Sequence, residues 1–350
     1  MSRDVDASRE LQEAVRAAAQ ARTPLAIRGG GTKHFHTGIL QGQPLDVTTH
    51  RGIVSYEPTE LVVTARGGTA LAEIEAALGE KGQMLGFEPP HFGDAATLGG
   101  TIACGFSGPR RPYAGAARDF VLGATIINGK GEILRFGGQV MKNVAGYDIS
   151  RLMVGAFGTL GVLLDVSLKV LPKPARELTL AFEIPTAKAI AVMNAWAGQP
   201  LPLSGACHLG DTLYMRLSGS VSGVHAAHGR LGGEFVEKSE EFWRELREHA
   251  RSFFRDETPL WRLSVPPATA PIDLPGKWCL DWGGAQRWLK SDAAADDIRR
   301  AAENAGGNAT LFRAAPNQSP LAVPTASALT RLQRNIRQAF DPMGTLNALA

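Results

Sequence analysis

The chain has 350 residues, of which 44% are apolar and 20% charged, and its formal net charge is +3. This length allows two domains with buried cores, and the composition is that of a globular protein, which excludes an intrinsically disordered chain. The small net charge, without a block of like charges, gives no case for nucleic-acid binding. The three cysteines, at positions 104, 207 and 279, are too widely spaced for a disulfide framework, a zinc finger or an iron–sulfur cluster, so reduced thiols in a cytoplasmic protein fit best.

The first predicted elements are a helix over 8–21, with Ser8 as the candidate N-cap, and a short strand over 24–27. The start of the chain, MSRDVDASRE, lacks the basic and apolar pattern of a secretory signal, and no apolar run is long enough to span a bilayer. Any membrane contact is therefore expected to be peripheral and through a partner.

Three consecutive glycines, Gly29 to Gly31, follow the strand directly and lie between Arg28 and Thr32. The N–H groups of such a loop can converge on an anion such as a phosphate. The loop does not fit the GxxxxGK[ST] pattern, and it does not fit GxGxxG because position 34 is His34. An ordinary turn after a strand is the alternative interpretation.

Short β-prone segments over 45–48, 53–56 and 61–65 come next, and Thr69 is placed to cap a helix over 71–78. Strands and helices do not alternate regularly in this part of the chain. The pattern therefore predicts an α+β fold and not a doubly wound sheet.

Glycine is densest between residues 89 and 161. Within this stretch Thr97 is placed to cap a short helix over 98–103. A helical glycine costs roughly 1 kcal/mol relative to alanine, so Gly99 and Gly100 imply close packing of this helix against a ligand or a neighbouring backbone. A loop-rich region with many turns is the alternative interpretation.

A hairpin is predicted from segments 119–127 and 132–136, since Asn128-Gly129 between them is a strong hairpin signal. A long strand over 162–171 then stops at Pro172-Lys173-Pro174, the best candidate for a domain boundary because two prolines block continued pairing. Beyond it, strands and helices alternate, which predicts an antiparallel, ferredoxin-like sheet with helices on one face, forming a cap domain.

The glycine-rich segments, taken in order, resemble the FAD-binding domain shared by vanillyl-alcohol oxidase and p-cresol methylhydroxylase. The matching segments are RGGGT at 28–32, YEPTELVVTARGG at 56–68, ATLGGTIACGFSGPRRPYAGAARDFVLGATIINGKGE at 96–132 and KNVAGYDISRLMVGAFGTLGVL at 142–163. Within this family the chain most resembles the FAD-binding E subunits of bacterial glycolate oxidase, with a short cap and a late DWGGAQRWL segment.

The resemblance implies an α+β protein with a two-lobed FAD-binding domain of the p-cresol methylhydroxylase type over 1–172, its lobes covering about 1–67 and 68–172. A smaller ferredoxin-like cap would cover 173–325, and a C-terminal segment over 326–350 would return to the FAD domain. This segment ends in FDPMGTLN, similar to the family's FDPxGxLNP ending except that Ala348 replaces the proline.

The resemblance also implies FAD-binding roles for the matched positions. The glycine loop and the segment after Thr97 would bind the pyrophosphate from two sides, and Gly161 and Val162 would present backbone groups near the adenine or flavin edge. Together the expected FAD contacts are Arg28, Gly29, Gly30, Gly31, Thr32, Lys33, Pro90, Thr97, Leu98, Gly99, Gly100, Ala103, Ser107, Gly108, Tyr113, Lys142, Asn143, Gly146, Tyr147, Gly158, Gly161, Val162 and Asn347.

Many relatives tether the flavin covalently through a histidine that follows the first pair of glycines. Gly31 and Thr32 occupy that region here, so FAD is expected to be bound non-covalently, with His34 and His36 as loop residues.

Oxidation of a 2-hydroxy acid requires a cation for the carboxylate, a base for the hydroxyl proton and hydride transfer to the flavin. The candidate cations are Arg216, Arg262 and Arg287, and the candidate bases are His208 and Asp281; structural roles are the alternative for each. No metal site is expected, because His225 and His228 have no third ligand at metal spacing. The HxGDGNxH-like segment that binds metal and substrate in D-type subunits has only a partial counterpart at residues 208–211.

The resemblance implies an FAD-dependent oxidoreductase subunit of a glycolate-oxidising complex. Its expected partners are a second FAD subunit of the D type and an iron–sulfur subunit, in the cytoplasm or peripherally at the inner face of the cytoplasmic membrane through the complex. The isolated chain is expected to oxidise glycolate poorly. The tryptophans between 243 and 288 are candidates for a docking surface or for core packing. A structural subunit that has lost its flavin, and a self-sufficient flavoenzyme for another hydroxy acid or alcohol, are the alternatives.

Overall fold

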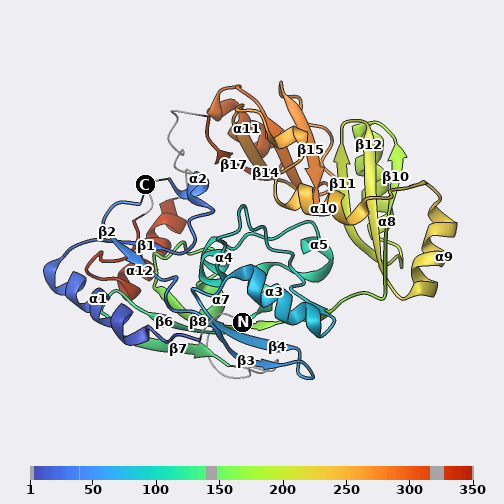
Figure 1. Ribbon diagram of the computed structural model, residues 1–350. Coiled ribbons are helices and arrows are strands. Elements are labelled where there is room, and N and C mark those ends of the chain that lie inside the picture. The colour runs from blue at the N-terminus through green and yellow to red at the C-terminus, as the bar shows by residue number, and fades with distance from the viewer. Residues whose placement is uncertain (1–3, 39, 139–147, 316–326, 349–350) are drawn as a thin grey trace. The chain divides into compact units, whose positions relative to one another are not determined.

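The computed structural model of the protein describes residues 4–38, 40–138, 148–315 and 327–348, and the chain forms two compact units (Figure 1). Unit 1 contains residues 1–107, 115–173 and 322–350, and unit 2 contains residues 108–114 and 174–321. The sequence analysis places residues 108–114 in the FAD-binding domain, whereas in the structure they belong to unit 2.

Unit 1 is built around a five-stranded antiparallel sheet in the order β3-β4-β8-β6-β7. Its strands are β3 (Ile53–Glu57), β4 (Val62–Arg66), β6 (Val121–Ile127), β7 (Ile133–Gly137) and β8 (Val162–Lys169). The predicted hairpin is confirmed, since β6 and β7 pair from Gly123 with Gly137 to Ile127 with Ile133. Two small sheets accompany it: β1 (Leu25–Arg28) pairs in parallel with β2 (Gln43–Asp46), and β5 (Gln83–Met84) pairs with β9 (Leu171–Pro172).

The helices of unit 1 are α1 (Ser8–Ala21), α2 (His34–Thr37), α3 (Leu71–Glu80), α4 (Leu98–Cys104), α6 (Ala117–Phe120), α7 (Ile149–Leu152) and α12 (Ser327–Phe340). One hydrophobic core joins α1 to the strands, with Leu11 and Val15 packed against Leu25 and Val162. Leu346 is part of the same core, so the C-terminal segment is an integral part of this unit.

Two of the predicted helix caps are wrong. Helix α1 begins at Ser8 itself, whose backbone N–H donates to the Asp6 carboxylate at 3.0 Å, and its N-cap is Ala7. The Thr69 hydroxyl bonds to the backbone of Gly52, so it is unavailable to α3, whose N-cap is Ala70. The Thr69 hydroxyl thus serves a long-range contact that local sequence rules do not include, whereas at Ser8 the predicted cap is one residue too late.

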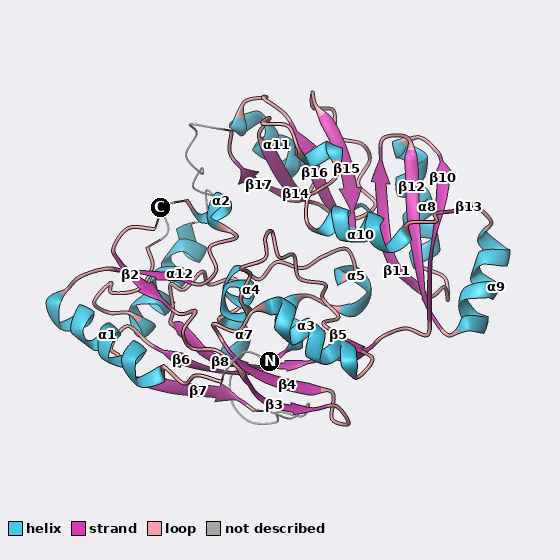
Figure 2. Cartoon of the chain, viewed as in Figure 1, coloured by secondary structure: helices cyan, strands magenta, loops and turns pink. Residues whose placement is uncertain are grey.

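Unit 2 is an eight-stranded antiparallel sheet in the order β13-β10-β12-β11-β15-β16-β14-β17 (Figure 2). Its strands are β10 (Arg176–Glu183), β11 (Leu203–Leu209), β12 (Thr212–Gly219), β13 (Glu234–Phe235), β14 (Leu260–Ser264), β15 (Lys277–Asp281), β16 (Gln286–Lys290) and β17 (Asn308–Arg313). Each half of the sheet has the spatial order fourth, first, third, second strand. The halves meet where β11 pairs with β15, so unit 2 consists of two ferredoxin-like halves.

The helices of unit 2 are α5 (Arg111–Ala114), α8 (Thr186–Ala197), α9 (Val221–Leu231), α10 (Ser239–Arg247) and α11 (Ala295–Asn304). Helices α8, α9 and α11 pack through three hydrophobic clusters on one face of the sheet. Helix α10 covers the opposite face, where Trp243 donates from Nε1 to the Thr179 hydroxyl at 2.8 Å. The expected ferredoxin-like α+β cap is confirmed, but helices cover both faces and not one.

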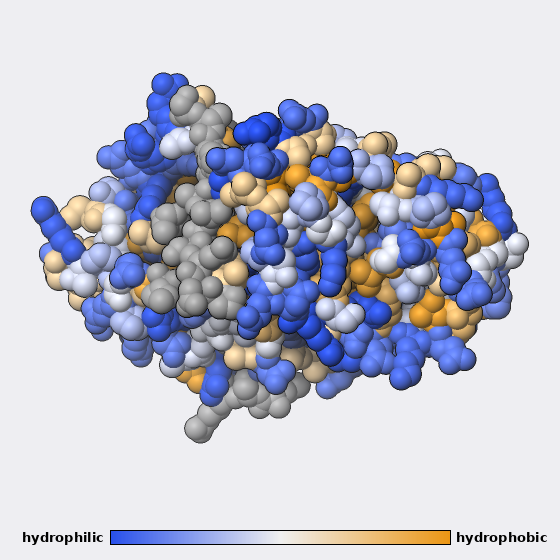
Figure 3. Space-filling view, turned by 90° about the horizontal axis from the view of Figure 1, so that it is seen from above, coloured by the Kyte–Doolittle hydropathy of each residue, from blue (hydrophilic) through white to orange (hydrophobic). Residues whose placement is uncertain are grey.

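Three of the five tryptophans between 243 and 288, namely Trp243, Trp261 and Trp288, are buried in unit 2 and therefore belong to its core. The face of the molecule in Figure 3 is mostly hydrophilic, with apolar residues in scattered patches. None of the helices over the described residues has the length and apolarity needed to traverse a bilayer.

Candidate functional site

The glycine loop after β1 packs backbone to backbone against the segment that precedes α4. A Cβ atom at Gly30 would lie 1.5 Å from the carbonyl oxygen of Ala95, and one at Gly29 would lie 2.6 Å from Thr97 Oγ1. No side chain fits at either position. The backbone N–H groups of Gly29, Gly30 and Gly31 donate no hydrogen bond to another residue of the described chain. The loop therefore presents three donors at a site that only glycine can form.

Thr97 caps α4 as predicted: its side-chain oxygen accepts from the Gly100 N–H at 3.2 Å. The two glycines of α4, Gly99 and Gly100, are explained by different contacts. Gly99 donates to the Gly67 carbonyl at 2.7 Å, and a Cβ there would lie 2.9 Å from that oxygen, so it is required by a neighbouring backbone. Gly100 meets only Thr97 Oγ1 within 4 Å of its ideal Cβ position and lines a pocket.

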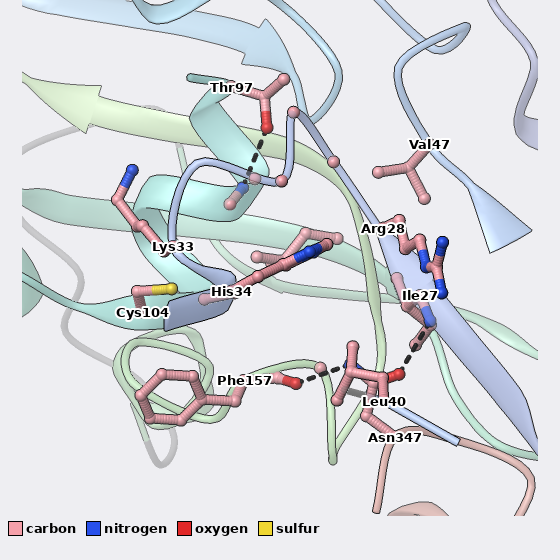
Figure 4. A pocket seen from close by; sticks show the side chains of 18 of the residues that line it. Ile27, Arg28, Lys33, His34, Leu40, Val47, Thr97, Cys104, Phe157 and Asn347 are labelled. Atoms are coloured by element: carbon pink, nitrogen blue, oxygen red, sulfur yellow. Dashed lines mark hydrogen bonds between the residues drawn. The ribbon is translucent and has the colours of Figure 1, made fainter. Parts of the chain in front are cut away.

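This pocket lies between the glycine loop, α4 and the segment before β8 (Figure 4). Thirteen of the expected FAD contacts line it: Arg28, Gly29, Gly30, Gly31, Thr32, Lys33, Thr97, Gly99, Gly100, Ala103, Gly158, Gly161 and Asn347. The sequence analysis missed seven further lining residues, which are Ile27, His34, Leu40, Val47, Cys104, Phe157 and Leu163. Most of these are apolar side chains, for which the sequence carries no signal that separates pocket walls from core.

Asn347 closes one side of the pocket from the C-terminal segment. Its Oδ1 accepts from the Ile27 N–H at 2.8 Å, and its Nδ2 donates to the Phe157 carbonyl at 2.9 Å (Figure 4). The side chain is 4% exposed, and it joins the end of β1 to the segment before β8. Asn347 therefore fixes two walls of the pocket relative to each other.

Two polar side chains give the pocket a positive character. Nε of Arg28 is buried without a hydrogen-bond partner among the described residues. Lys33 is 6% exposed, and its Nζ donates to Thr32 Oγ1 and to the His91 carbonyl, both at 3.2 Å. The neighbouring thiol is neutral, because burial raises the pKa of Cys104 to about 11 although Lys33 opposes the shift.

His34 and His36 lie on the short helix α2 and not in a loop, because the Gly38 N–H donates to the His34 carbonyl and closes a helical turn. The His34 ring lines the pocket. The His36 ring packs against Phe106 and Phe157, at centroid distances of 5.2 and 5.8 Å.

The other expected FAD contacts lie elsewhere. Lys142, Asn143, Gly146 and Tyr147 fall outside the described residues. Leu98 and Val162 are buried in unit 1, Pro90 does not line the pocket, and the Ser107 hydroxyl accepts from the Ala117 N–H at 3.0 Å. Gly108 and Tyr113 belong to unit 2, where the Gly108 carbonyl accepts from Trp282 Nε1 at 3.0 Å.

All five candidate catalytic residues are in unit 2, and the structure gives four of them partners inside this unit. His208 Nε2 lies 2.9 Å from the Ile184 carbonyl, and Asp281 accepts from the Trp282 N–H at 2.7 Å. Arg216 donates to the Ser204 hydroxyl and carbonyl, at 3.1 and 2.9 Å, and stacks on Trp243. Arg287 donates to the carbonyls of Gly284, Ala270 and Thr269.

The fifth candidate, Arg262, lies over the Phe312 ring at 5.8 Å. Burial, together with the charge of Arg111, lowers its pKa to about 10. Arg111 itself stacks on Trp282 at 4.3 Å. Arg111 was not among the candidates, because nothing in the sequence relates the segment 108–114 to β14.

No metal centre is formed by the candidate histidines. His225 and His228 lie on α9, and within the described part of the chain no group of three His, Cys, Asp or Glu side chains is arranged to hold a metal ion.

The pocket in unit 1 fits a nucleotide cofactor. Three free backbone donors, a buried guanidinium nitrogen without a partner, and two crowded glycines are what a pyrophosphate requires, and an apolar wall continues beyond them. Unit 1 and this site define an FAD-binding protein, since residues 5–137 match the family model described as an FAD binding domain.

Sequence similarity to known proteins narrows the class of FAD-binding protein to which the chain belongs. The chain is 51% identical over 348 residues to the glycolate oxidase subunit GlcE of Escherichia coli (strain K12), covering 99% of this chain and 98% of that protein. It is 30% identical over 197 residues to the glycolate oxidase subunit GlcD of Bacillus subtilis (strain 168), covering 55% of this chain and 42% of GlcD. The chain belongs to the family of GlcE glycolate oxidase subunits, and FAD is its cofactor.

Solved structures show the same fold. An alkyldihydroxyacetonephosphate synthase superposes with a TM-score of 0.67, covering 96% of this chain and 74% of that chain, at 14% sequence identity. At this identity the likeness concerns the fold alone.

Proposed function

We propose that this chain is the FAD-binding subunit of a multi-subunit glycolate oxidase, which oxidises glycolate to glyoxylate and passes the electrons through flavin to an iron–sulfur subunit. A second FAD subunit of the D type would complete the complex, which would lie in the cytoplasm or peripherally at the inner face of the cytoplasmic membrane. The observation that carries the proposal is the similarity to GlcE along the whole chain, together with the glycine cradle, by which we mean Gly29 to Gly31 and the facing segment Thr97 to Gly100.

The residues of unit 1 would bind and orient the cofactor. The N–H groups of Gly29 to Gly31 and the Arg28 guanidinium would bind its phosphates. When bound, FAD supplies a two-electron acceptor for hydride from the α-carbon of a 2-hydroxy acid. The position after the glycine pair, where many relatives carry the tethering histidine, is Gly31, so we propose non-covalent binding.

The residues of unit 2 support a division of labour between subunits. His208, Arg216 and Arg287 are all under 3% exposed and are bound to acceptors or donors within unit 2. The segment 208–211, the partial counterpart of a metal-and-substrate motif, forms the end of β11 and its tight connection to β12, and His208 Nε2 lies 2.9 Å from the Ile184 carbonyl. We therefore propose that the isolated chain oxidises glycolate poorly and that the D-type subunit carries most of the substrate chemistry.

The test compares the purified chain with the co-expressed three-subunit complex, using glycolate and a dye as electron acceptor. We expect a yellow, flavin-containing single chain with little turnover and a complex with steady turnover. Steady turnover by the single chain would contradict the division of labour. A colourless chain that fails to take up added FAD would instead identify a structural subunit.

A further inference from the structure

One residue in the wall of the pocket of unit 1 has a strained backbone. Phe157 has a φ of 52°, in the left-handed region, which is disfavoured for a residue with a Cβ by a factor of about 5–30. Seven described residues other than glycine have a positive φ, and Phe157 is the one among them that lines the pocket. Strained conformations persist only where the surrounding structure holds them, and they gather at ligand sites. The contacts of Phe157 therefore show what shapes this wall.

The backbone of Phe157 is held from two sides. Its N–H donates to the Ala103 carbonyl of α4 at 2.9 Å, and its carbonyl accepts from Asn347 Nδ2 at 2.9 Å (Figure 4). The next residue, Gly158, has a φ of 74°, and a Cβ there would lie 2.8 Å from Asn347 Nδ2. The glycine thus leaves room for the Asn347 amide beside the strained residue. Asn347 lies 190 positions away in the chain, so this contact depends on the complete fold of unit 1.

Asn347 belongs to a C-terminal strap, residues 341–347, which follows α12 and runs along one edge of β1. The other edge of β1 pairs with β2. On the edge of the strap the Leu25 N–H donates to the Thr345 carbonyl and the Ile27 N–H to Asn347 Oδ1, both at 2.8 Å. Because these N–H groups belong to alternate residues, the strap takes the place of a third strand. The glycine loop follows β1 directly, so the strap supports this loop as well.

The strap is itself fixed by contacts within unit 1. The Asp341 carboxylate accepts from the N–H groups of Thr345 and Leu346, at 2.8 and 2.9 Å, which closes a turn. Asp341 is 4% exposed, and Leu346, at 1%, is part of the core. Arg337 of α12 donates from Nη2 to the Asn347 carbonyl at 3.2 Å. The backbone of Asn347 is therefore held in place, and its side chain joins the strap to both walls of the pocket.

We infer that Asn347 is a positioning residue for FAD that acts through Phe157: the pocket binds the cofactor only while the strap is docked and its amide holds Phe157 in the left-handed conformation. This inference deepens the proposed function and rests on it, because it requires that the pocket binds FAD. Docking of the strap and binding of FAD then favour each other reciprocally. Loss of the bond from Asn347 to Phe157 reduces the fraction of molecules whose wall has the shape that binds FAD.

The first test measures the dissociation constant of FAD for the full chain and for Asn347→Asp by flavin fluorescence. The aspartate keeps the oxygen that accepts from Ile27 and loses the donor to Phe157. Without this bond the strain of Phe157 favours another shape of the wall, so the dissociation constant should rise about tenfold. The matched control is Asn194→Asp in unit 2, where Nδ2 also donates to two backbone carbonyls. It should bind FAD as the unchanged chain does.

A second variant, Phe157→Gly, separates positioning from direct contact with FAD. Glycine adopts positive φ about as readily as negative φ, so the wall no longer needs the bond to overcome strain. In the Phe157→Gly background, Asn347→Asp should raise the dissociation constant of FAD at most about twofold, against about tenfold in the unchanged background. An equal effect in both backgrounds would show that Asn347 does not act through the strain of Phe157 and would overturn the inference.

Hydrogen exchange of the unchanged chain tests the coupling without any substitution. The N–H groups of Thr345 and Leu346 belong to the strap, and neither residue lines the pocket. Free FAD at about 100 times its dissociation constant should slow their exchange about 100-fold relative to the chain without FAD. The N–H groups of Leu180 and Leu217, which are buried in unit 2, should exchange at the same rate in both samples. Exchange in the strap that does not respond to FAD would overturn the inference, even where Asn347→Asp does not fold.

The remaining outcomes separate this inference from the proposed function. FAD binding by Asn347→Asp with the dissociation constant of the unchanged chain would overturn the inference and leave the FAD pocket in place. A tenfold rise for Asn194→Asp as well would show a general loss of stability and would also overturn it. Failure of the unchanged chain to bind FAD would remove the proposed role of the pocket together with that of the strap.

Discussion

The two units of this protein use polar groups in opposite ways. In unit 1 the pocket is bordered by backbone donors of Gly29 to Gly31 that have no partner among the described residues. In unit 2 the buried charges are paired with the protein itself: Arg287, 1% exposed, donates to three carbonyls, and Lys290, 3% exposed, lies 2.6 Å from Asp256. Polar groups without a hydrogen-bond partner in the protein indicate a ligand, whereas buried polar groups that are bonded within the protein stabilise its fold.

The comparison shows that burial alone does not distinguish a ligand-binding residue from a structural one. A buried arginine has the residue type expected of a substrate-binding cation, yet Arg287 has all three of its nitrogens engaged. A glycine loop has no functional side chain at all, yet it supplies the free donors. The comparison predicts that changes in the cradle affect flavin binding, and that changes at the buried charges affect stability.

The largest effect is expected from Gly100→Val. The new side chain would occupy the pocket, and its Cβ would lie about 3.1 Å from the oxygen of the Thr97 cap, so flavin binding should be lost. The measurement is the flavin absorbance of the purified variant. Gly79→Ala is the matched control, since that helical position has only Lys173 Nζ within 4 Å and should keep its flavin. A folded Gly100→Val protein with normal flavin would show that the pocket is not the FAD site.

The next effect is expected from Arg287→Met in unit 2. It leaves three carbonyls without their donor, which should lower the free energy of unfolding by about 3 kcal/mol in urea titrations. Flavin content should be unchanged, because the cradle lies in unit 1. Arg300→Met, at a side chain that is 67% exposed, should cost little. If Arg287→Met were fully stable but inactive in the complex, Arg287 would be a substrate ligand and the comparison would fail.

How far the sequence leads depends on whether the relevant contacts are local. The cap at Thr97, the hairpin around Asn128 and the glycine loop are specified by residues close in sequence, and the structure forms each of them. The cap at Thr69 was predicted wrongly because its hydroxyl bonds to Gly52, which is distant in the sequence, and the cap of α1 was misplaced by one residue, at Ser8 and not at Ala7.

The residues that line the pocket could likewise be predicted from the sequence only in part. Its glycines were predictable because crowding and positive φ leave a composition signal. Its apolar lining, such as Val47 and Phe157, was not, because an apolar residue looks the same to the sequence whether it faces a core or a pocket. Segment 108–114 contacts unit 2 through residues that are far apart in the chain, among them the Arg110–Glu177 ion pair at 2.6 Å and the hydrogen bond from Trp282 Nε1 to the Gly108 carbonyl.

A pH effect is expected from the thiol in the pocket. Burial raises the pKa of Cys104 to about 11, from an ordinary value of 9.0. Between these values the unfolded chain has lost the proton and the folded chain retains it, so stability falls as the pH rises. The cost should be about 1.4 kcal/mol for each pH unit. The Cys104→Ser variant should show a shallower decline than the unchanged chain in urea titrations from pH 8.5 to 10.5; equal slopes would mean that the thiol is not buried.

The smallest effect, and the sharpest on the cradle, is expected from Thr97→Ala. Loss of the cap on α4 should cost about 1 kcal/mol of unfolding free energy. The same hydroxyl oxygen lies where a Cβ of Gly29 would clash, so it also spaces the glycine loop from α4, and its loss should raise the dissociation constant of FAD about fivefold. Thr97→Ser keeps the oxygen and should preserve both properties. If Thr97→Ala lowered stability but left FAD affinity unchanged, the two sides of the pocket would be set independently, and the cradle would be two separate loops and not one coupled site.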